Sequence, residues 1–205
     1  MTILRKSALL LLLLAVTISV GACAPVASEA SPWHGKPYEE RTPAPDFTLA
    51  NIRGGVFQLS QHRGTPVLLY FGYTHSEDID PATLYNISWV FDKLSTRPEY
   101  QVEFVMISVD PARDSPTAFR RYLDAYDPKF IGLIGDSGAL QAVENAYGVT
   151  VEKKAVSGPG SQEYTLNHTS TVFMIDRQGN LVTRYPYGTE PESILADLLY
   201  LLQES

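Results

Sequence analysis

The 205-residue chain has almost no cysteine: Cys23 is the only one, and it lies outside the part that reads as a folded domain. A thiol–disulfide cycle within one domain needs two cysteines. A thiol peroxidase needs at least one reactive cysteine. The sequence therefore excludes both activities, and we expect a protein that is not an enzyme of either kind.

Basic residues are also few, with 16 Lys and Arg against 23 Asp and Glu, a formal net charge of −7 and a pI of about 5.1. Binding to nucleic acid requires a basic face that neutralises phosphates. This composition argues against a nucleic-acid partner. The hydrophobic share of 44% is ordinary for one globular domain plus an appendage.

Long apolar runs are missing as well, because the run from Ala8 to Val20 is too short to span a bilayer comfortably. It follows Arg5 and Lys6, which is typical of a signal peptide. The run ends in VGAC at 20–23, where small residues before Cys23 resemble a bacterial lipobox. We interpret residues 1–22 as a lipoprotein signal peptide and Cys23 as the lipid attachment. An ordinary secretory signal is the alternative.

This interpretation predicts an extracytoplasmic protein, held by its lipid to a bacterial cell membrane or outer membrane. Residues 23–44 are rich in Pro, Ala, Ser and charge, and we expect them to form a lipidated tether. The domain proper is expected over residues 45–205.

Within that domain, strand patterns alternate with helix patterns, as in βαβ units. A strand–helix unit at 67–71 and 81–94 is followed by others at 102–109 with 116–126 and at 130–134 with 137–147. Short hairpins are expected at 47–59 and 171–185, and 149–156 and 162–166 flank a loop at 157–161. A closing helix is expected at 191–202. This order predicts an α/β, thioredoxin-like fold, with a central mixed sheet flanked by helices.

Three motifs narrow the prediction: YFGYTH at 70–75, ISVDPARDSP at 107–116 and HTSTVFMIDRQGNLVTRY at 168–185. Together they resemble the Sco/SenC family, and the likeness runs from about Pro45 to Leu202. The resemblance implies a membrane-anchored, thioredoxin-like protein that delivers copper to cytochrome c oxidase or keeps its cysteines reduced. In the family, copper is held by two cysteines of a Cys-x-x-x-Cys-Pro motif and by a distal histidine.

Carried over by position, the resemblance matches His168 to the family histidine and Pro81 to the proline after the second cysteine. Ser76 and Asp80 stand where the two cysteines are expected. Asp110, Pro111, Arg113 and Asp114 match a second family motif, whose role we take as mainly structural.

Cu(I) is soft and favours thiolates, whereas Ser76 and Asp80 offer hard oxygens. Copper binding is therefore expected to be weak or absent, and the set suits Cu(II) or Zn(II) better. His168 and Asp80 are the candidate metal ligands, with Ser76 in a former ligand position and His75 nearby in sequence.

Each candidate also has a structural interpretation. Asp80 before Pro81 fits a helix N-cap followed by proline at the first helical position. Ser76 is a chemically quiet replacement for cysteine, and His168 a relic bonded to the backbone. A hydrolase triad of Ser76, His168 and Asp80 is a third interpretation, which lacks a nucleophile elbow.

Two functional hypotheses remain. The first is a Sco-like lipoprotein with a degenerate site, a non-redox accessory in cytochrome c oxidase copper-centre assembly or copper homeostasis. Its partners would be a cytochrome c oxidase subunit or a copper-handling protein. The second is a metal-free pseudo-thioredoxin module that binds a partner protein at the membrane.

Overall fold

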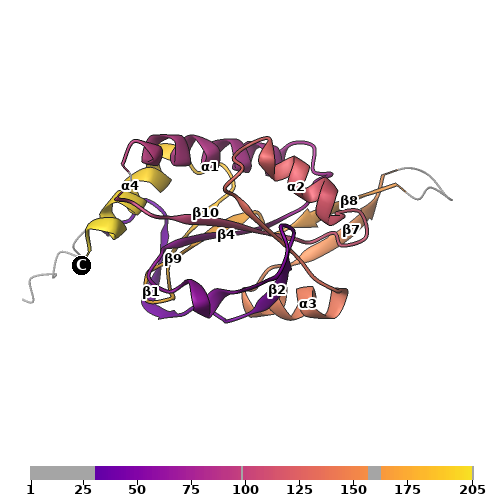
Figure 1. Cartoon of the computed structure of the whole chain (residues 1–205), viewed down its shortest axis with the longest axis horizontal. Coiled ribbons are helices and arrows are strands. Elements are labelled where there is room, and N and C mark those ends of the chain that lie inside the picture. Colours follow the sequence, from indigo (N-terminus) through magenta and orange to yellow (C-terminus); the bar gives the residue numbers. More distant parts are fainter. Residues whose placement is uncertain (1–30, 98, 157–162, 205) are drawn as a thin grey trace, which may run out of the picture. The chain divides into compact units, whose positions relative to one another are not determined.

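The computed structural model describes residues 31–97, 99–156 and 163–204. The signal peptide, Cys23 and the loop at 157–161 lie outside these residues. Within them, an eight-stranded sheet has the order β1-β10-β9-β4-β5-β6-β2-β3, and β7 and β8 form a separate two-stranded sheet (Figure 1). None of the helices in these ranges combines the length and hydropathy needed to cross a bilayer.

The strands are β1 (Lys36–Pro43), β2 (Thr48–Asn51), β3 (Val56–Gln58), β4 (Val67–Gly72), β5 (Glu103–Ser108), β6 (Ile131–Ile134), β7 (Val151–Ala155), β8 (Tyr164–His168), β9 (Thr171–Ile175) and β10 (Asn180–Pro186). The helices are α1 (Ile79–Ser95), α2 (Pro116–Asp124), α3 (Ser137–Ala146) and α4 (Pro191–Gln203), with a short 3-10 turn η1 (Leu59–His62).

The centre of the sheet is mixed, because β4 pairs in parallel with β5 and antiparallel with β9. Every residue of β4 is buried, as expected for a strand covered on both faces. The helices α1 and α2 make the crossovers to β5 and β6, so the ends of β4 and β5 lie at the same edge. This confirms the predicted α/β, thioredoxin-like fold.

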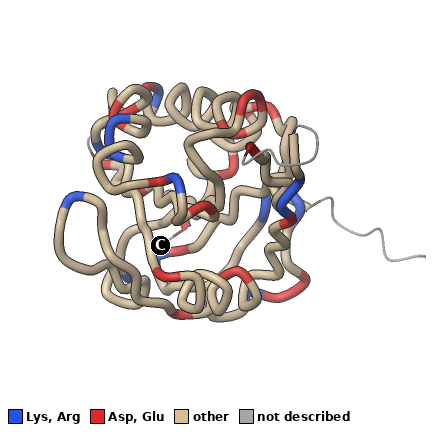
Figure 2. Tube along the Cα trace, turned by 90° about the vertical axis from the view of Figure 1, so that its right-hand side faces the viewer, with Lys and Arg blue, Asp and Glu red and all other residues tan. Residues whose placement is uncertain are grey.

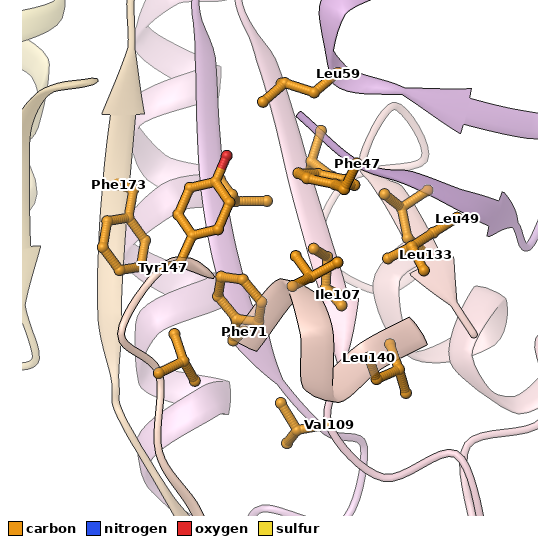
Figure 3. Packing of buried hydrophobic residues seen from close by; sticks show 14 of the residues in the cluster. Phe47, Leu49, Leu59, Phe71, Ile107, Val109, Leu133, Leu140, Tyr147 and Phe173 are labelled. Carbon is orange, nitrogen blue, oxygen red and sulfur yellow. The ribbon is translucent and has the colours of Figure 1, made fainter. Parts of the chain in front are cut away.

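Helices cover both faces of the sheet, with α1, α2 and α4 on one side and α3 on the other (Figure 1). The α3 side is rich in aromatic side chains, and the ring of Tyr147 lies 5.7 Å from that of Phe71 and 5.5 Å from that of Phe173 (Figure 3). On the other side, Leu84, Ile87 and Val90 of α1 are fully buried. The two cores fix the end of β4 from both faces.

Charged residues of both signs are interspersed along the described chain, as Figure 2 shows. Some basic residues are neighbours in the sequence, such as Lys153 and Lys154, but acidic segments lie among the basic ones in this view. The described surface therefore has mixed charge.

The first strand corrects the predicted tether, because Lys36–Pro43 pairs with β10 at the edge of the main sheet. All but one of its eight residues are exposed, and its sequence KPYEERTP is charged and contains two prolines. Such a composition is typical of a linker. It is also typical of edge strands, where charged residues and prolines prevent pairing with other chains. The folded domain therefore begins before Pro45.

Candidate functional site

The site lies where β4 ends, at the start of α1 and beside the end of β8. Asp80 comes from the first turn of α1, and His168 is the last residue of β8. The Nε2 atom of His168 lies 3.1 Å from Oδ1 of Asp80, and their side chains are 2% and 0% exposed. The fold thus brings together the two residues that the sequence predicts as metal ligands.

The Asp80 carboxylate is fully engaged by its surroundings. The Tyr70 hydroxyl donates to Oδ1 at 2.5 Å, and the backbone N–H of Tyr73 donates to Oδ2 at 2.9 Å. Burial and then the nearby Asp80 carboxylate raise the pKa of Tyr70 far above its usual range, so this hydroxyl remains a donor. Two tyrosines of the YFGY segment therefore hold the carboxylate, a role that the sequence analysis missed.

These contacts correct the expected helix start. The helix α1 begins at Ile79 with Asp78 as its N-cap, and the Asp78 side chain makes no cap hydrogen bond. Asp80 and Pro81 lie inside the first turn, and the Asp80 side chain points inward instead of capping. The sequence pattern is compatible with both arrangements, and the polar groups at the end of β4 decide between them.

Gly72 makes room for this carboxylate. A Cβ atom added at Gly72 would lie 2.9 Å from Oδ2 of Asp80 and 2.7 Å from Cε of Met106. Real Cβ atoms essentially never approach other heavy atoms below 3.0 Å. Glycine at the end of β4 therefore allows the carboxylate to pack against the strand.

Aromatic rings enclose His168 on two sides. The ring of Tyr70 stands edge-on at 6.2 Å and that of Tyr73 at 5.8 Å. The remaining ring nitrogen, Nδ1, lies 3.3 Å from the backbone oxygen of Thr169. Both nitrogens of His168 are thus turned toward oxygen atoms of the protein.

Ser76 and His75 are directed to other groups. The hydroxyl oxygen of Ser76 accepts the backbone N–H of Asp80 at 3.2 Å, so Ser76 ties the turn to α1. His75 is half exposed, and its Nδ1 lies 2.9 Å from the Thr74 hydroxyl and 3.8 Å from the Asp114 carboxylate. A nucleophilic serine needs a base within hydrogen-bonding reach, and these contacts do not give Ser76 that arrangement.

The donor set does not fit Cu(I). Among the residues with described positions, no group of three or more His, Cys, Asp or Glu is arranged to hold a metal ion. The two candidates that meet, Asp80 and His168, already satisfy each other, and neither carries sulfur. Cu(I) prefers soft sulfur ligands, so this arrangement supports no copper chemistry of the thiolate kind.

A groove opens beside the pair, between the turn before α1 and strand β8. Its walls include Ser76, Ile79, Val156 and His168. Ile79 is 38% exposed and Val156 61% exposed, so apolar side chains stand on both walls. A groove with exposed apolar walls suits contact with another molecule better than it suits a closed catalytic centre.

The DPARD segment, residues 110–114, holds the turn beside the site through hydrogen bonds. The carboxylate of Asp114 accepts the hydroxyls of Thr74 and Ser108, both at 2.6 Å. Burial raises the pKa of Asp114 above its usual value, although these hydrogen bonds oppose the shift. The segment therefore fixes the turn that carries Ser76, as its predicted structural role requires.

Comparison with known proteins identifies the family of the chain. The SCO1/SenC family model matches residues 36–203. An SCO2-like protein of Rickettsia felis is 30% identical over 151 residues, which cover 73% of this chain and 72% of the relative.

Solved structures of Sco proteins share the fold of this chain. Apo Sco1 of Thermus thermophilus is 34% identical, with a TM-score of 0.72 over 82% of this chain and 96% of that one. Copper-bound ScoI of Bradyrhizobium japonicum is 32% identical, with a TM-score of 0.69 over 78% of this chain and 99% of that one.

BsSco, whose solved structure is 20% identical to this chain with a TM-score of 0.62, is a member of the Sco family of cytochrome c oxidase assembly proteins. The family match spans nearly all of the described domain, and the sequence likeness and the shared fold point the same way. The chain belongs to the SCO1/SenC family.

Proposed function

We propose that this chain is a Sco protein without cysteines in its folded domain, and that it serves cytochrome c oxidase assembly or copper homeostasis by contacting a partner protein. It acts as a non-redox accessory, not as a carrier that holds Cu(I) on thiolates. The observation that carries the proposal is the Asp80 carboxylate, which stands at the expected position of the second cysteine and hydrogen-bonds Tyr70 and Tyr73 and contacts His168.

The buried pair stabilises this site through protein groups alone. A buried charge is stable only when it is paired and hydrogen-bonded. Asp80 meets this condition through two hydrogen-bond donors and the imidazole of His168. The pair thus holds the end of β4, the start of α1 and the end of β8 together through bonds within the protein.

Partner contact is assigned to the groove beside the pair. Ile79 and Val156 offer exposed apolar surface on its walls. The proposed partner is a cytochrome c oxidase subunit or a copper-handling protein, as the family membership favours. Lipid attachment at Cys23 and a location on the outer side of a bacterial membrane complete the proposal.

A second candidate function is weak binding of Cu(II) or Zn(II) by Asp80 and His168. The 3.1 Å separation of Nε2 and Oδ1 suits two neighbouring ligands, each at about 2.0–2.2 Å from a metal. Only two protein ligands would be supplied, so we expect this binding to be weak and easily reversed by a chelator.

Gene deletion with complementation tests the main proposal. Deletion is expected to lower cytochrome c oxidase activity in membranes of the source organism, and the wild-type gene to restore it. Ile79→Asp should fail to restore activity because it places a charge on the groove wall. Tyr85→Asp is the matched control, since Tyr85 is 69% exposed on the same helix and is not one of the groove residues.

Either of two results would contradict the proposal. One is oxidase activity that does not depend on the gene. The other is full complementation by Ile79→Asp in protein that accumulates normally.

A further inference from the structure

The strand that carries His168 is attached to the domain in an unusual way. In the ranges described, β8 pairs only with β7, and this hairpin makes no ladder with the main sheet. It extends at one end of the sheet (Figure 1). The backbone of β8 must therefore be satisfied and held by other groups along its outer edge.

Tyr73 occupies one stretch of that edge. Its hydroxyl accepts the backbone N–H of Leu166 at 3.1 Å and also lies 3.3 Å from the Leu166 carbonyl oxygen. The hydroxyl of Thr165 lies 2.9 Å away. One phenol thus meets both backbone groups of Leu166, as a neighbouring strand would.

Arg113 occupies the next stretch. Its Nη1 donates to the Tyr164 carbonyl oxygen at 2.8 Å, and its guanidinium lies 3.6 Å from the centre of the Tyr164 ring. Lys153 of β7 also approaches this ring, at 3.6 Å. Asp110 accepts from Arg113 Nε at 2.5 Å and from the Tyr164 hydroxyl at 2.7 Å, which fixes both partners.

We propose that Tyr73 and Arg113 are positioning residues that dock the β7–β8 hairpin and thereby hold His168 against Asp80. Tyr73 also stands edge-on to the His168 ring at 5.8 Å, so it contacts both the strand and the imidazole. Arg113 and Asp110 of the DPARD segment have a definite task in this scheme, which is to clamp the hairpin at Tyr164.

Side chains, namely those of Tyr73, Arg113, Asp110 and Asp80, and core packing attach the hairpin to the domain, whereas β4 has a ladder on both sides. We therefore expect the hairpin to open as a unit, with a smaller free energy than global unfolding requires. That the docked hairpin serves partner contact, by placing His168 on the groove wall, rests on the proposed function. The docking itself is measured without a partner, so the two can fail separately.

Amide hydrogen exchange, measured by NMR on the full-length protein, tests the docking of the hairpin. The Leu166 amide reports directly, because it donates to the Tyr73 hydroxyl. In Tyr73→Phe we expect its exchange to accelerate about tenfold, while amides of β5 change less than about twofold. Arg113→Lys, which loses the planar fork, should accelerate exchange across the hairpin.

The imidazole of His168 supplies a second readout, because its ring resonances should shift in both variants as its contact with Asp80 loosens. Tyr147→Phe and Arg53→Lys are the matched controls. Tyr147 bonds to the Pro45 carbonyl oxygen and Arg53 to the Pro128 carbonyl oxygen, away from the hairpin. Neither control should move the Leu166 exchange rate or the His168 resonances.

Unchanged Leu166 exchange and unchanged His168 resonances in both variants would overturn the proposal. So would an equal acceleration at every amide, which would indicate global destabilisation alone. If a variant does not fold, exchange in the wild-type protein decides: hairpin amides less protected than those of β4 and β5 support the proposal, and equal protection overturns it.

Discussion

At the scale of single residues, the site depends on Asp80, whose side chain is wholly buried with the His168 imidazole beside it. The sequence alone indicates that Asp80 and His168 are candidates, because the family resemblance marks their positions. It does not indicate that they contact each other, since residues 80 and 168 meet only through the packing of β8 beside α1. The partners Tyr70 and Tyr73 are equally hidden, because tyrosines at a strand end read as ordinary core residues.

Asp80→Ala is expected to cost about 3–5 kcal/mol in the free energy of unfolding, because it leaves Tyr70, Tyr73 and His168 without their acceptor in a buried place. Urea denaturation followed by circular dichroism measures this cost. Asp78→Ala is the matched control, since Asp78 is exposed and makes no side-chain cap bond, and it should cost no more than about 0.5 kcal/mol. Equal effects of the two substitutions would contradict the role given to Asp80.

Glu144 on α3 offers a test of pH dependence. Burial raises the pKa of its carboxyl above the ordinary value of 4.5, so the folded protein binds the proton more tightly than the unfolded chain. Ionisation of Glu144 therefore disfavours folding. The stability of the wild type should fall relative to Glu144→Gln as the pH rises from below the pKa of the unfolded chain to above the raised pKa of the folded protein.

We expect the two proteins to have equal stability near pH 3.5 and the Gln variant to be the more stable of the two at pH 7. Thermal unfolding at both pH values measures the difference. A variant that is less stable than the wild type at pH 7 would show that the carboxylate has a stabilising partner.

At the scale of elements, most strands and helices follow from the sequence. The apolar run of β4 and the spacing of Leu84, Ile87 and Val90 in α1 predict their elements because burial imposes those patterns. The edge strand β1 could not be predicted in this way, since an exposed strand carries no burial pattern. The attachment of the β7–β8 hairpin was also hidden, because the side chains that hold it lie far away in sequence.

Asp197 of α4 tests the docking of β1. Its buried carboxylate accepts the backbone N–H groups of His34 and Gly35 at 2.9 Å and the Tyr185 hydroxyl at 3.0 Å. Asp197→Ala removes these acceptors, so the segment before β1 should detach more often and trypsin should cleave after Arg41 about tenfold faster.

Mass spectrometry of the products measures that cleavage. The control is Glu192→Ala, an exposed acidic residue in the first turn of the same helix. If the Asp197 and Glu192 variants are cleaved at the same rate, the buried carboxylate does not hold β1.

At the scale of the whole molecule, the fold, the family and the lack of sulfur at the site were predictable, whereas the contacts among the site residues were not. Long-range order of strands and helices specifies a thioredoxin-like architecture, and the SCO1/SenC family match covers residues 36–203. Membership of the family nevertheless does not imply that this chain binds Cu(I), because Ser76 and Asp80 carry no sulfur.

If the fold has kept the family geometry, two substitutions should restore a copper site. In Ser76→Cys/Asp80→Cys, the thiol at position 80 would replace a side chain that lies 3.1 Å from Nε2 of His168, and the thiol at position 76 would line the same groove as His168. We expect one equivalent of Cu(I) to bind to the double variant, and binding to weaken when His168→Ala is added. Competition with a chromophoric Cu(I) chelator measures it, and no gain of binding in a folded double variant would show that the geometry has been lost.

The same titration on the chain with its natural residues 76 and 80 tests the central claim most directly. Cys23→Ser is used as the background to remove the only thiol, and the double-cysteine variant in that background is the positive control. The account predicts that Cu(I) stays with the chelator, and that Asp80→Ala and His168→Ala leave the titration unchanged. One equivalent of Cu(I) retained against the chelator and lost in both variants would show that Asp80 and His168 hold copper, and would contradict the account.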